Sequence, residues 1–442
     1  MSKQITASSR ELESIVGSDR VSDWEDIEGI RRVGIERAIA PGISPSCIVY
    51  PHTEAEIAEL IACAHHNKWR VLPKGSGSKL SWGGLVENVQ MVLSTQRLNQ
   101  LIQHAVGDLT VTVEAGTKFA DLQDALATAG QFLALDPVAP ESATMGGIVA
   151  TASAGSLRQR YGGVRDQLLG ITFVRADGQI AKAGGRVVKN VAGYDLMKLF
   201  TGSYGTLGII TSVTFRVYPL PEASETVVLT GKADAITLAL TTVRSSALTP
   251  TANDLLSTQM VERLGIGQGL GLITRFQSLT ESVKKQSAGL LEVGRQLGLQ
   301  GAIYSARDEA DLWQKLQKQM RASTTESVIT CKIGVLPSLA VAILTQLDSV
   351  APQQIISLIH AGSGLGLLQL ETRPVTPEIV LEMRSLCQTQ GGFLTILEAP
   401  VTLKQQLDVW GYSSNALNLM RRIKQQFDPE NILSPHRFVG GI

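Results

Sequence analysis

The chain has 442 residues, 44% of them hydrophobic, which suits about two or three folded domains and excludes a largely disordered protein. Lys and Arg together number 40, as do Asp and Glu, so no net charge favours nucleic acid or an anionic membrane as a partner. The four cysteines lie far apart without C-x-x-C spacing, which excludes a chain-encoded iron–sulfur cluster and is typical of reduced thiols in the cytoplasm.

The first residues, "MSKQITASSRELES", lack the apolar centre of a secretory signal, and no apolar run approaches the roughly 20 residues of a membrane-spanning helix. We therefore expect a cytoplasmic protein that reaches a membrane, if at all, through partner proteins. Residues 1–44 are polar with a helical pattern and are predicted to form an N-terminal helical lead-in. A strand at 46–51 then precedes a helix at 52–69, with Thr53 as the expected N-cap and Glu56 completing a capping box. Its apolar residues Ile57, Leu60, Ile61 and Ala64 have the spacing of one helical face and predict a buried stripe.

The remaining elements fall into three further segments. Up to residue 221 we predict, in order, strands at 70–73, 89–94 and 109–116, a helix at 118–131, a hairpin at 168–180 that turns at Asp177-Gly178, and a long strand at 208–221 that two prolines close. This segment, 45–221, is one predicted domain. Glycine becomes rarer over 222–415, where alternating strands and helices predict a second α+β domain, an antiparallel sheet with helices on one face. Residues 416–442 are predicted to be a helix and an irregular tail.

Three glycine-rich segments, 73–84, 144–163 and 202–208, lie in the first half of the chain, each beside a predicted strand. A single such loop is weak evidence, because it can be an ordinary turn. Three together favour a concave site where backbone N–H groups meet a ligand closely, which suits a pyrophosphate. The near-match "GIGQGLG" at 265–271 lacks the acidic residue of a Rossmann unit, and there is no P-loop, G-x-S-x-G or H-E-x-x-H motif.

The residues in these segments resemble a known family. The stretches "PSCIVYPHTEAEIAELI…RVLPKGSGSKLSWGG", "DPVAPESATMGGIVATASAG…YGGVRDQLLGITFVRADGQI" and "GYDLMKLFTGSYGTLGIITSVTFRVYP" resemble the FAD-binding domain of the vanillyl-alcohol oxidase / p-cresol methylhydroxylase (PCMH) superfamily, in the same order. The stretch "GGRVVKNVAGYDLMKLFTGSYGTLGII" is most similar to the FAD-binding E-type subunits of glycolate dehydrogenase (glycolate oxidase). The resemblance implies an α+β fold: a two-part PCMH-type FAD-binding domain, a C-terminal α+β cap domain built on an antiparallel sheet with helices, and a tail, "FDPENILSP", that returns to the FAD domain.

The resemblance also implies which residues hold FAD. The loop after residue 72, with its nearby cations Lys74 and Lys79, is expected to wrap the pyrophosphate with backbone amides; the segment from Thr144 is expected to cover the cofactor from the other side; and a backbone amide and carbonyl of Ile209 or Ile210 are expected to meet the adenine. The full set of expected cofactor-binding residues is Pro73, Lys74, Gly75, Ser76, Gly77, Ser78, Pro137, Thr144, Gly146, Gly147, Ala150, Ser153, Gly155, Tyr161, Gly162, Val164, Gly208, Ile209 and Ile210.

Two positions in the resemblance bear on the chemistry of the flavin. Covalent members of the superfamily carry a flavin-linked histidine where this chain has Ser78, so the FAD is expected to be noncovalent. Lys189, in "VVKNVAGYDL", is a candidate catalytic contact to flavin or substrate, although a solvated lysine is an equally open interpretation. Asp195 in the same motif is expected to anchor its loop.

The catalytic D-type subunits related to this family hold a metal with the motif His-Ala-Gly-Asp-Gly-Asn-Leu-His and a later Gly-Glu-His-Gly. Here "HAGSGLGL" at 360–367 and "LEAP" at 397–400 keep His360 and Glu398 but replace the aspartate with Ser363 and both further histidines with Leu367 and Ala399. One histidine and one carboxylate are too few ligands, so no catalytic metal is expected. His360 is a candidate general base, while a packing role in the cap stays open.

The resemblance therefore implies an FAD-binding subunit of a 2-hydroxy-acid dehydrogenase complex, which oxidises glycolate to glyoxylate and passes electrons onward. Because this chain has no iron–sulfur cysteines, onward transfer implies a partner chain. The resemblance implies that the partners are a D-type flavin subunit and an Fe–S subunit. Two alternatives stay open: a self-sufficient FAD-dependent dehydrogenase or oxidase of a related hydroxy acid or alcohol, and a flavin-bearing structural subunit without turnover.

Overall fold

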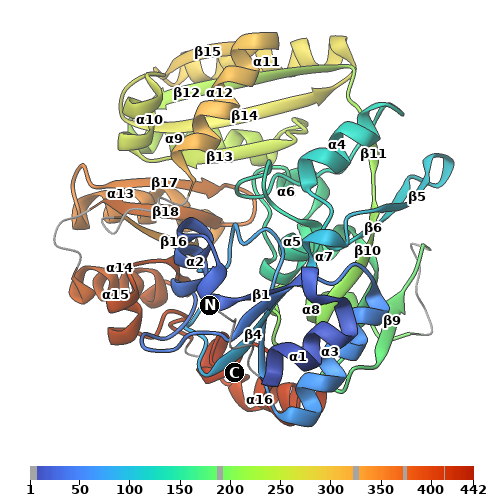
Figure 1. Ribbon diagram of the computed structural model, residues 1–442. Helices are drawn as coiled ribbons and strands as arrows, with labels where there is room; N and C mark the ends of the chain where they lie inside the picture. The colour runs from blue at the N-terminus through green and yellow to red at the C-terminus, as the bar shows by residue number, and fades with distance from the viewer. Residues whose placement is uncertain (1–6, 187–192, 322–327, 372–375, 413) are drawn as a thin grey trace. The chain divides into compact units, whose positions relative to one another are not determined.

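The structure is a computed structural model that describes residues 7–186, 193–321, 328–371, 376–412 and 414–442 (Figure 1). The chain divides into two compact units. Unit 1 consists of Met1–Ser153, Gly163–Pro219 and Tyr412–Ile442, and unit 2 consists of Ala154–Gly162 and Leu220–Gly411. No described helix combines the length and the apolar character needed to cross a membrane.

The first half of unit 1 is a four-stranded sheet in the order β1-β2-β4-β3, in which β2, β4 and β3 run parallel and β1 is antiparallel. Its elements are α1 (Ala7–Val16), β1 (Val21–Asp23), α2 (Gly29–Glu36), β2 (Cys47–Val49), α3 (Glu54–Asn67), β3 (Arg70–Lys74) and β4 (Val89–Ser94), with 3-10 turns at Ser18–Arg20, Trp24–Asp26 and Thr95–Arg97. The sheet is too small and too mixed to be a doubly wound Rossmann sheet.

Helix α3 forms as its sequence predicts. The Thr53 side chain accepts a hydrogen bond from the Glu56 amide, while the Glu56 carboxylate accepts from the His52 amide rather than from Thr53 itself. The predicted apolar stripe of α3 is fully buried and packs in one hydrophobic cluster with residues of β2, β3 and β4. The parallel β2–β4–β3 arrangement follows from this packing, because the crossover helix α3 covers one face of the sheet.

The second half of unit 1 is a five-stranded antiparallel sheet in the order β5-β6-β10-β8-β9. Strands β7 and β11 form a separate antiparallel pair. The elements are β5 (Leu101–Ala105), β6 (Thr110–Glu114), α4 (Phe119–Ala127), β7 (Gln131–Phe132), α5 (Met145–Thr151), α7 (Val164–Gln167), β8 (Leu168–Val174), β9 (Ile180–Gly184), α8 (Leu196–Phe200), β10 (Ile209–Arg216) and β11 (Tyr218–Pro219), with a 3-10 turn at Val106–Asp108. The predicted hairpin is the β8–β9 pair, and Gly178 in its turn has a φ of +82°.

The C-terminal segment of unit 1 consists of α16 (Leu417–Phe427), an irregular tail and a 3-10 turn at Val439–Gly441. The tail lies along strand β3: the Val71 amide donates to the Ile432 carbonyl at 2.7 Å, and the Ser434 amide donates to the Val71 carbonyl at 3.0 Å. Two buried side chains of this segment, Lys424 and Asp428, form an ion pair at 2.6 Å. The last residues of the chain are therefore part of the core that carries β3.

Unit 2 is an eight-stranded antiparallel sheet in the order β15-β12-β14-β13-β17-β18-β16-β19. The strands are β12 (Ala223–Gly231), β13 (Ala252–Leu256), β14 (Leu270–Ser278), β15 (Gln300–Ser305), β16 (Val328–Gly334), β17 (Ile355–His360), β18 (Leu365–Glu371) and β19 (Phe393–Glu398). The helices are α6 (Arg158–Tyr161), α9 (Ala233–Ser245), α10 (Thr258–Leu264), α11 (Thr280–Gln296), α12 (Ala306–Gln319), α13 (Ala340–Val350), α14 (Pro377–Thr389) and α15 (Val401–Gln406), with a 3-10 turn at Pro337–Leu339.

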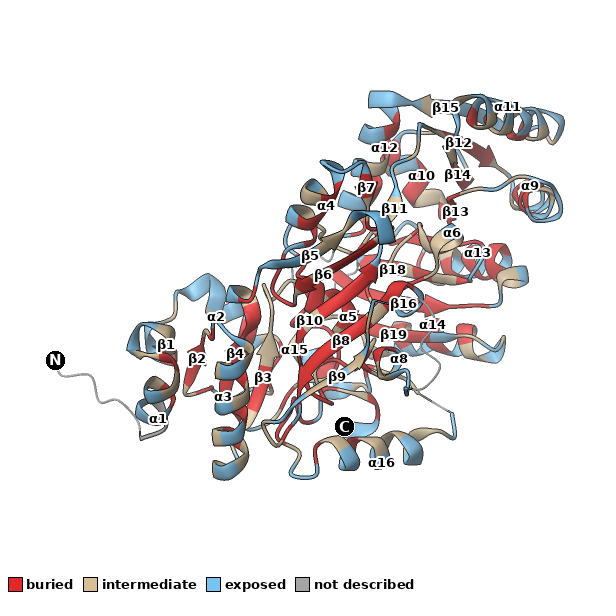
Figure 2. Ribbon diagram, turned by 90° about the vertical axis from the view of Figure 1, so that its right-hand side faces the viewer, coloured by how far each residue is buried: buried red, intermediate tan, exposed pale blue. Residues whose placement is uncertain are grey.

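The prediction that helices cover only one face of this sheet is wrong. Helices α9, α11, α13 and α14 pack in one hydrophobic cluster with the strands, while α10 and α12 build a second cluster with Ile273 and Leu358, whose side chains point to the other face. Figure 2 shows the buried residues concentrated along the strands within each unit. Every residue of β17 is buried, and its apolar side chains lie on both faces of the sheet. A strand of this kind requires packed helices on both faces.

Candidate functional site

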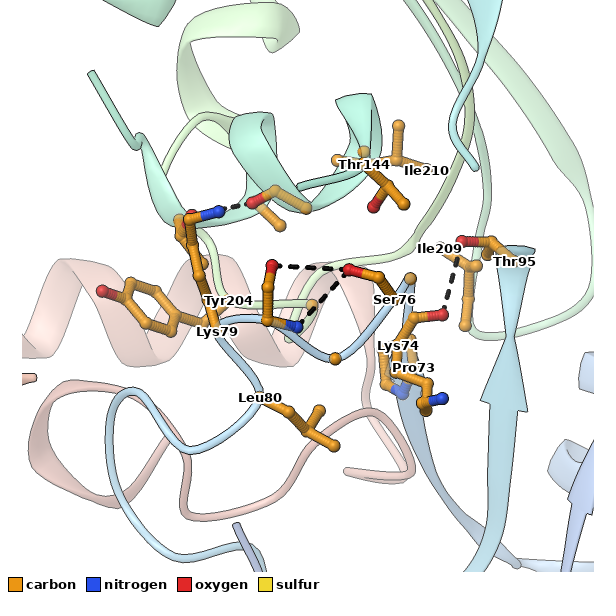
Figure 3. A pocket seen from close by; sticks show the side chains of 18 of the residues that line it. Pro73, Lys74, Ser76, Lys79, Leu80, Thr95, Thr144, Tyr204, Ile209 and Ile210 are labelled. Carbon is orange, nitrogen blue, oxygen red and sulfur yellow. Dashed lines mark hydrogen bonds between the residues drawn. The ribbon is translucent and has the colours of Figure 1, made fainter. Parts of the chain in front are cut away.

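A pocket with an empty volume of about 680 Å³ opens in unit 1 (Figure 3). Five segments line it: the end of β3 with the loop after it, the turn after β4, helix α5 with the residue before it, the turn that leads into β10, and the C-terminal tail. Most of the cofactor residues expected from the sequence lie in its wall, namely Pro73, Lys74, Gly75, Ser76, Gly77, Ser78, Thr144, Gly146, Gly147, Ala150, Gly208, Ile209 and Ile210.

Glycine is required twice in the loop after β3, for different reasons. Gly77 has a φ of +89°, a left-handed conformation that side chains with a Cβ adopt only with strain. At Gly75, a Cβ atom would collide with the Oγ1 atom of Thr144 at the start of α5. The glycines therefore let the loop turn and let it approach α5 closely.

The loop presents polar backbone groups to the pocket. Within the described residues, the amides of Gly75, Ser76 and Gly77 donate no hydrogen bond, whereas the Ser78 amide lies 3.4 Å from the Ser76 Oγ atom. Thr95 donates its hydroxyl to the Lys74 carbonyl at 3.3 Å and so ties the base of the loop to the end of β4. A loop of this kind can bind an anion through its free N–H groups.

The charge of the pocket is positive. Lys74, Lys79 and Arg437 are among its lining residues, and none of the lining residues is an aspartate or a glutamate. Burial lowers the pKa of Lys79 to about 8; burial and the charge of Arg31 do the same for Lys74. Burial also lowers the pKa of Arg437 to about 10. Cations that are this poorly hydrated favour an anionic ligand.

Some expected cofactor residues do not line this pocket. Pro137, Ser153 and Val164 lie in unit 1 outside the pocket wall, and the Ser153 hydroxyl accepts a hydrogen bond from the Val138 amide at 3.2 Å. Gly155, Tyr161 and Gly162 belong to unit 2. Lys189 falls outside the described residues, and Asp195 precedes α8 and forms an exposed ion pair with Lys198 at 2.9 Å.

The pocket wall also contains residues that the sequence analysis did not select. They are Leu80, Thr95, Thr151, Tyr204, Gly205 and Arg437. Lys79, which also lines the pocket, was predicted only as a cation near the glycine-rich loop and not as a binding residue. Gly205, with a φ of +75°, could have been selected because it lies in the third glycine-rich segment. Arg437 has no comparable sequence signal, since the tail reaches the pocket only through its pairing with β3.

In unit 2, His360 forms a buried pair with Asp254. The two residues lie opposite each other on β17 and β13, and the His360 Nδ1 atom is 2.7 Å from the Asp254 Oδ1 atom. A carboxylate has no proton to donate, so Nδ1 donates and Nε2 is the proton-accepting nitrogen. The second carboxylate oxygen of Asp254 is buried and has no hydrogen-bond partner among the described residues. Asp254 was not selected from the sequence, because only strand register brings it to His360.

The two surviving positions of the metal motif are not brought together. Strands β18 and β16 lie between β17, which carries His360, and β19, which carries Glu398, and three strand spacings amount to about 14 Å. In the part of the chain that the structure describes, no three His, Cys, Asp or Glu side chains are grouped as metal ligands. The expected absence of a metal stays a prediction to be tested by elemental analysis.

Comparison with known proteins places these observations in context. Residues 45–184 match the model of the FAD binding domain family. The chain is 24% identical to the glycolate oxidase subunit GlcD of Bacillus subtilis over 421 residues, which cover 88% of each protein, and 27% identical to the D-lactate dehydrogenase of Archaeoglobus fulgidus over 421 residues, covering 89% of this chain and 91% of that one. Its fold is similar to that of p-cresol methylhydroxylase with bound substrate (TM-score 0.73, 16% identity, 98% of both chains) and of 4-ethylphenol oxidase from Gulosibacter chungangensis (TM-score 0.75, 15% identity, 98% of both chains).

Proposed function

We propose that the chain is an FAD-dependent oxidoreductase and the FAD-binding subunit of a 2-hydroxy-acid dehydrogenase complex that oxidises glycolate to glyoxylate. The match of residues 45–184 to the FAD binding domain family supports FAD as its cofactor. The observation that carries this proposal is the similarity to a glycolate oxidase subunit and to a D-lactate dehydrogenase, because both matches extend over nearly the whole chain, including the unit that follows the FAD binding domain. Glycolate and D-lactate share a carboxylate and a neighbouring hydroxyl-bearing carbon.

The pocket of unit 1 fits FAD in its chemistry. We propose that the free amides of Gly75, Ser76 and Gly77 bind the pyrophosphate, that the segment from Thr144 to Ala150 faces the cofactor, and that the backbone of Ile209 or Ile210 meets the adenine. The positive, carboxylate-free wall supports this assignment, since a dinucleotide brings two negative phosphates.

The flavin is expected to be noncovalently bound. Ser78 stands in the pocket wall at the position where covalent relatives carry histidine, and a serine hydroxyl cannot form the histidyl–flavin bond. Precipitating the purified protein with acid should release the yellow colour into the supernatant. Colour that stays with the protein pellet after washing would overturn this prediction.

His360 is the proposed proton acceptor of the reaction. With its Nδ1–H group donating a hydrogen bond to Asp254, the imidazole can accept the hydroxyl proton of the substrate at Nε2, and the Asp254 carboxylate stabilises the imidazolium that forms. When bound, FAD supplies the two-electron acceptor for the oxidation of the substrate carbon. Lys189 remains a second candidate contact to flavin or substrate. The hydroxyl proton would pass to His360, and the bound FAD would supply the acceptor for the carbon-bound hydrogen together with the two electrons, as a hydride, which accounts for the two protons and two electrons that glycolate loses on becoming glyoxylate.

Anaerobic titration of the FAD-loaded chain with glycolate tests the function and the role of His360 together. We expect the wild-type flavin to be reduced, with weak or no sustained turnover until a D-type flavin subunit and an Fe–S subunit are added. His360→Gln, which keeps a hydrogen-bonding side chain but removes the base, should slow reduction by about 10²- to 10⁴-fold with unchanged FAD content. The exposed His66→Gln is the matched control and should behave as wild type.

Three other outcomes would change the proposed function or the role of His360. Sustained turnover by the isolated chain, or a stoichiometric metal in elemental analysis, would replace the proposal with a self-sufficient dehydrogenase. A flavin that no hydroxy acid reduces, even with partners present, would identify a structural flavin subunit. Equal reduction rates in wild type and His360→Gln would assign His360 a packing role.

A further inference from the structure

Lys79 is a buried cation whose charge nothing in the described structure balances. The residue is 5% exposed, its Nζ atom is fully buried, and it has no hydrogen-bond partner among the described residues. Its Nζ atom lies over the Trp82 ring, 6.0 Å from the ring centroid, which is a weak cation–π contact. Lys424, on helix α16 of the C-terminal segment, shows how this chain otherwise buries an ammonium group: it contacts Asp428, the Thr206 carbonyl and the Leu433 carbonyl. An uncompensated buried charge is costly, so Lys79 indicates an anion that occupies the pocket.

A second cation is held beside Lys79 by the tail of the chain. The Arg437 Nη2 atom donates to the Leu80 carbonyl at 2.6 Å and lies 3.5 Å from the Lys79 carbonyl. The Arg437 carbonyl accepts from the Gly84 amide at 2.9 Å. These contacts fix the arginine against the loop 358 residues earlier in the chain, and both side chains line the same pocket.

We infer that Lys79 and Arg437 form a side-chain subsite for a diphosphate, so that the C-terminal tail is part of the cofactor site and a nucleoside diphosphate can bind there without a flavin. The inference rests on the proposed assignment of the pocket to FAD. A diphosphate fits better than a carboxylate, because its two charged groups can meet two separate cations while further oxygens accept from the free amides of Gly75, Ser76 and Gly77.

Proton uptake on binding follows from the same arrangement. The other titratable groups that line the pocket with Lys79 are Lys74, Arg437 and the Tyr204 phenol, and no carboxylate lines it. Burial lowers the pKa of Lys79 to about 8, so a fraction of the empty sites holds a neutral amine at pH 8. An anion favours the protonated form and raises this pKa. Binding therefore takes up protons near pH 8, and the affinity falls as the pH rises from 7 to 9.

The test uses flavin-free full-length protein, prepared from the FAD-loaded chain, and titration calorimetry with ADP, inorganic pyrophosphate, AMP and riboflavin. We expect ADP and pyrophosphate to bind the wild type, and AMP and riboflavin to bind at least tenfold more weakly than ADP. Lys79→Met keeps a side chain of similar length without its charge, and it should lower the affinities for ADP and FAD by about 10- to 100-fold. Lys182→Met removes an exposed lysine of β9 and serves as the control, with affinities equal to wild type.

Two further measurements separate a binding role from a folding role. Arg437→Lys retains a cation on the tail and should lose less affinity than Arg437→Met, with both variants checked for a wild-type circular dichroism spectrum. Calorimetry at pH 8 in two buffers of different ionisation enthalpy should show proton uptake in wild type and less in Lys79→Met, because only Lys74 then remains to be protonated.

The outcomes distinguish this inference from the function on which it rests. If wild-type protein binds FAD but Lys79→Met binds FAD and ADP with wild-type affinity, the subsite is refuted and the proposed function stands. If ADP binds no more tightly than AMP, the ligand is not recognised through a diphosphate, and the inference again fails alone. If the wild type retains no FAD under any condition, the proposed function fails as well.

Discussion

Replacing Gly77 by valine should give a folded protein that no longer retains FAD. Gly77 has a φ of +89°, and a β-branched residue in this region costs about 1–3 kcal/mol of backbone strain. The strain is relieved when the loop rotates out of the left-handed region. Rotation moves the amides of Ser76 and Gly77, which are proposed to bind the pyrophosphate, so cofactor affinity is lost while the cores of both units remain.

Gly42→Val is the control for this experiment. Gly42 has a nearly equal φ of +82°, a Cβ atom added to it would meet no heavy atom within 4 Å, and it is not among the residues that line the pocket. Compared as flavin-free proteins, both variants should lose similar stability in thermal unfolding, because bound FAD would itself stabilise the fold. Only Gly77→Val should lose flavin absorbance relative to protein absorbance after gel filtration. A Gly77→Val protein with a full complement of FAD would show that this loop does not hold the pyrophosphate.

Asp428→Ala should lower the free energy of unfolding by about 3–5 kcal/mol. The Asp428 carboxylate is fully buried and accepts hydrogen bonds from the Lys424 ammonium and from the amides of Ile432 and Leu433, at 2.6 to 3.0 Å. Removing it leaves a buried lysine without its counter-ion and two amides without an acceptor. The lost contacts hold the turn between α16 and the strand-like tail beside β3, so the effect extends to the pairing of the tail with Val71.

Glu430→Ala is the matched control in the same turn. Its carboxylate is partly exposed and lies 3.8 Å from Lys68 in a surface ion pair, so its loss should change stability by no more than about 0.5 kcal/mol. Urea unfolding followed by circular dichroism measures both variants. Equal stabilities for Asp428→Ala and Glu430→Ala would mean that the buried network does not hold the tail.

The sequence by itself determined the features that depend on neighbours in the chain. Helix α3 begins at its predicted cap and buries its predicted stripe, strand β4 covers the predicted 89–94, and the β8–β9 hairpin turns at the predicted Asp177-Gly178. Helix caps, tight turns and apolar periodicity depend on residues that are close together in the sequence, so they can be predicted from a single segment. The loop at 73–78 was found for the same reason, because its glycines report a local backbone requirement, and the resemblance to a flavoprotein family supplied the cofactor.

Only the tertiary structure decided which distant residues meet. Asp254 faces His360 because β13 and β17 are neighbours in a sheet whose strand order does not follow the chain. Arg437 reaches Lys79 because the tail adds hydrogen bonds to β3, and Glu398 is separated from His360 by two intervening strands. Strand register and chain return are decided by the burial of whole faces and the pairing of backbone groups across hundreds of residues, and no local sequence pattern encodes them.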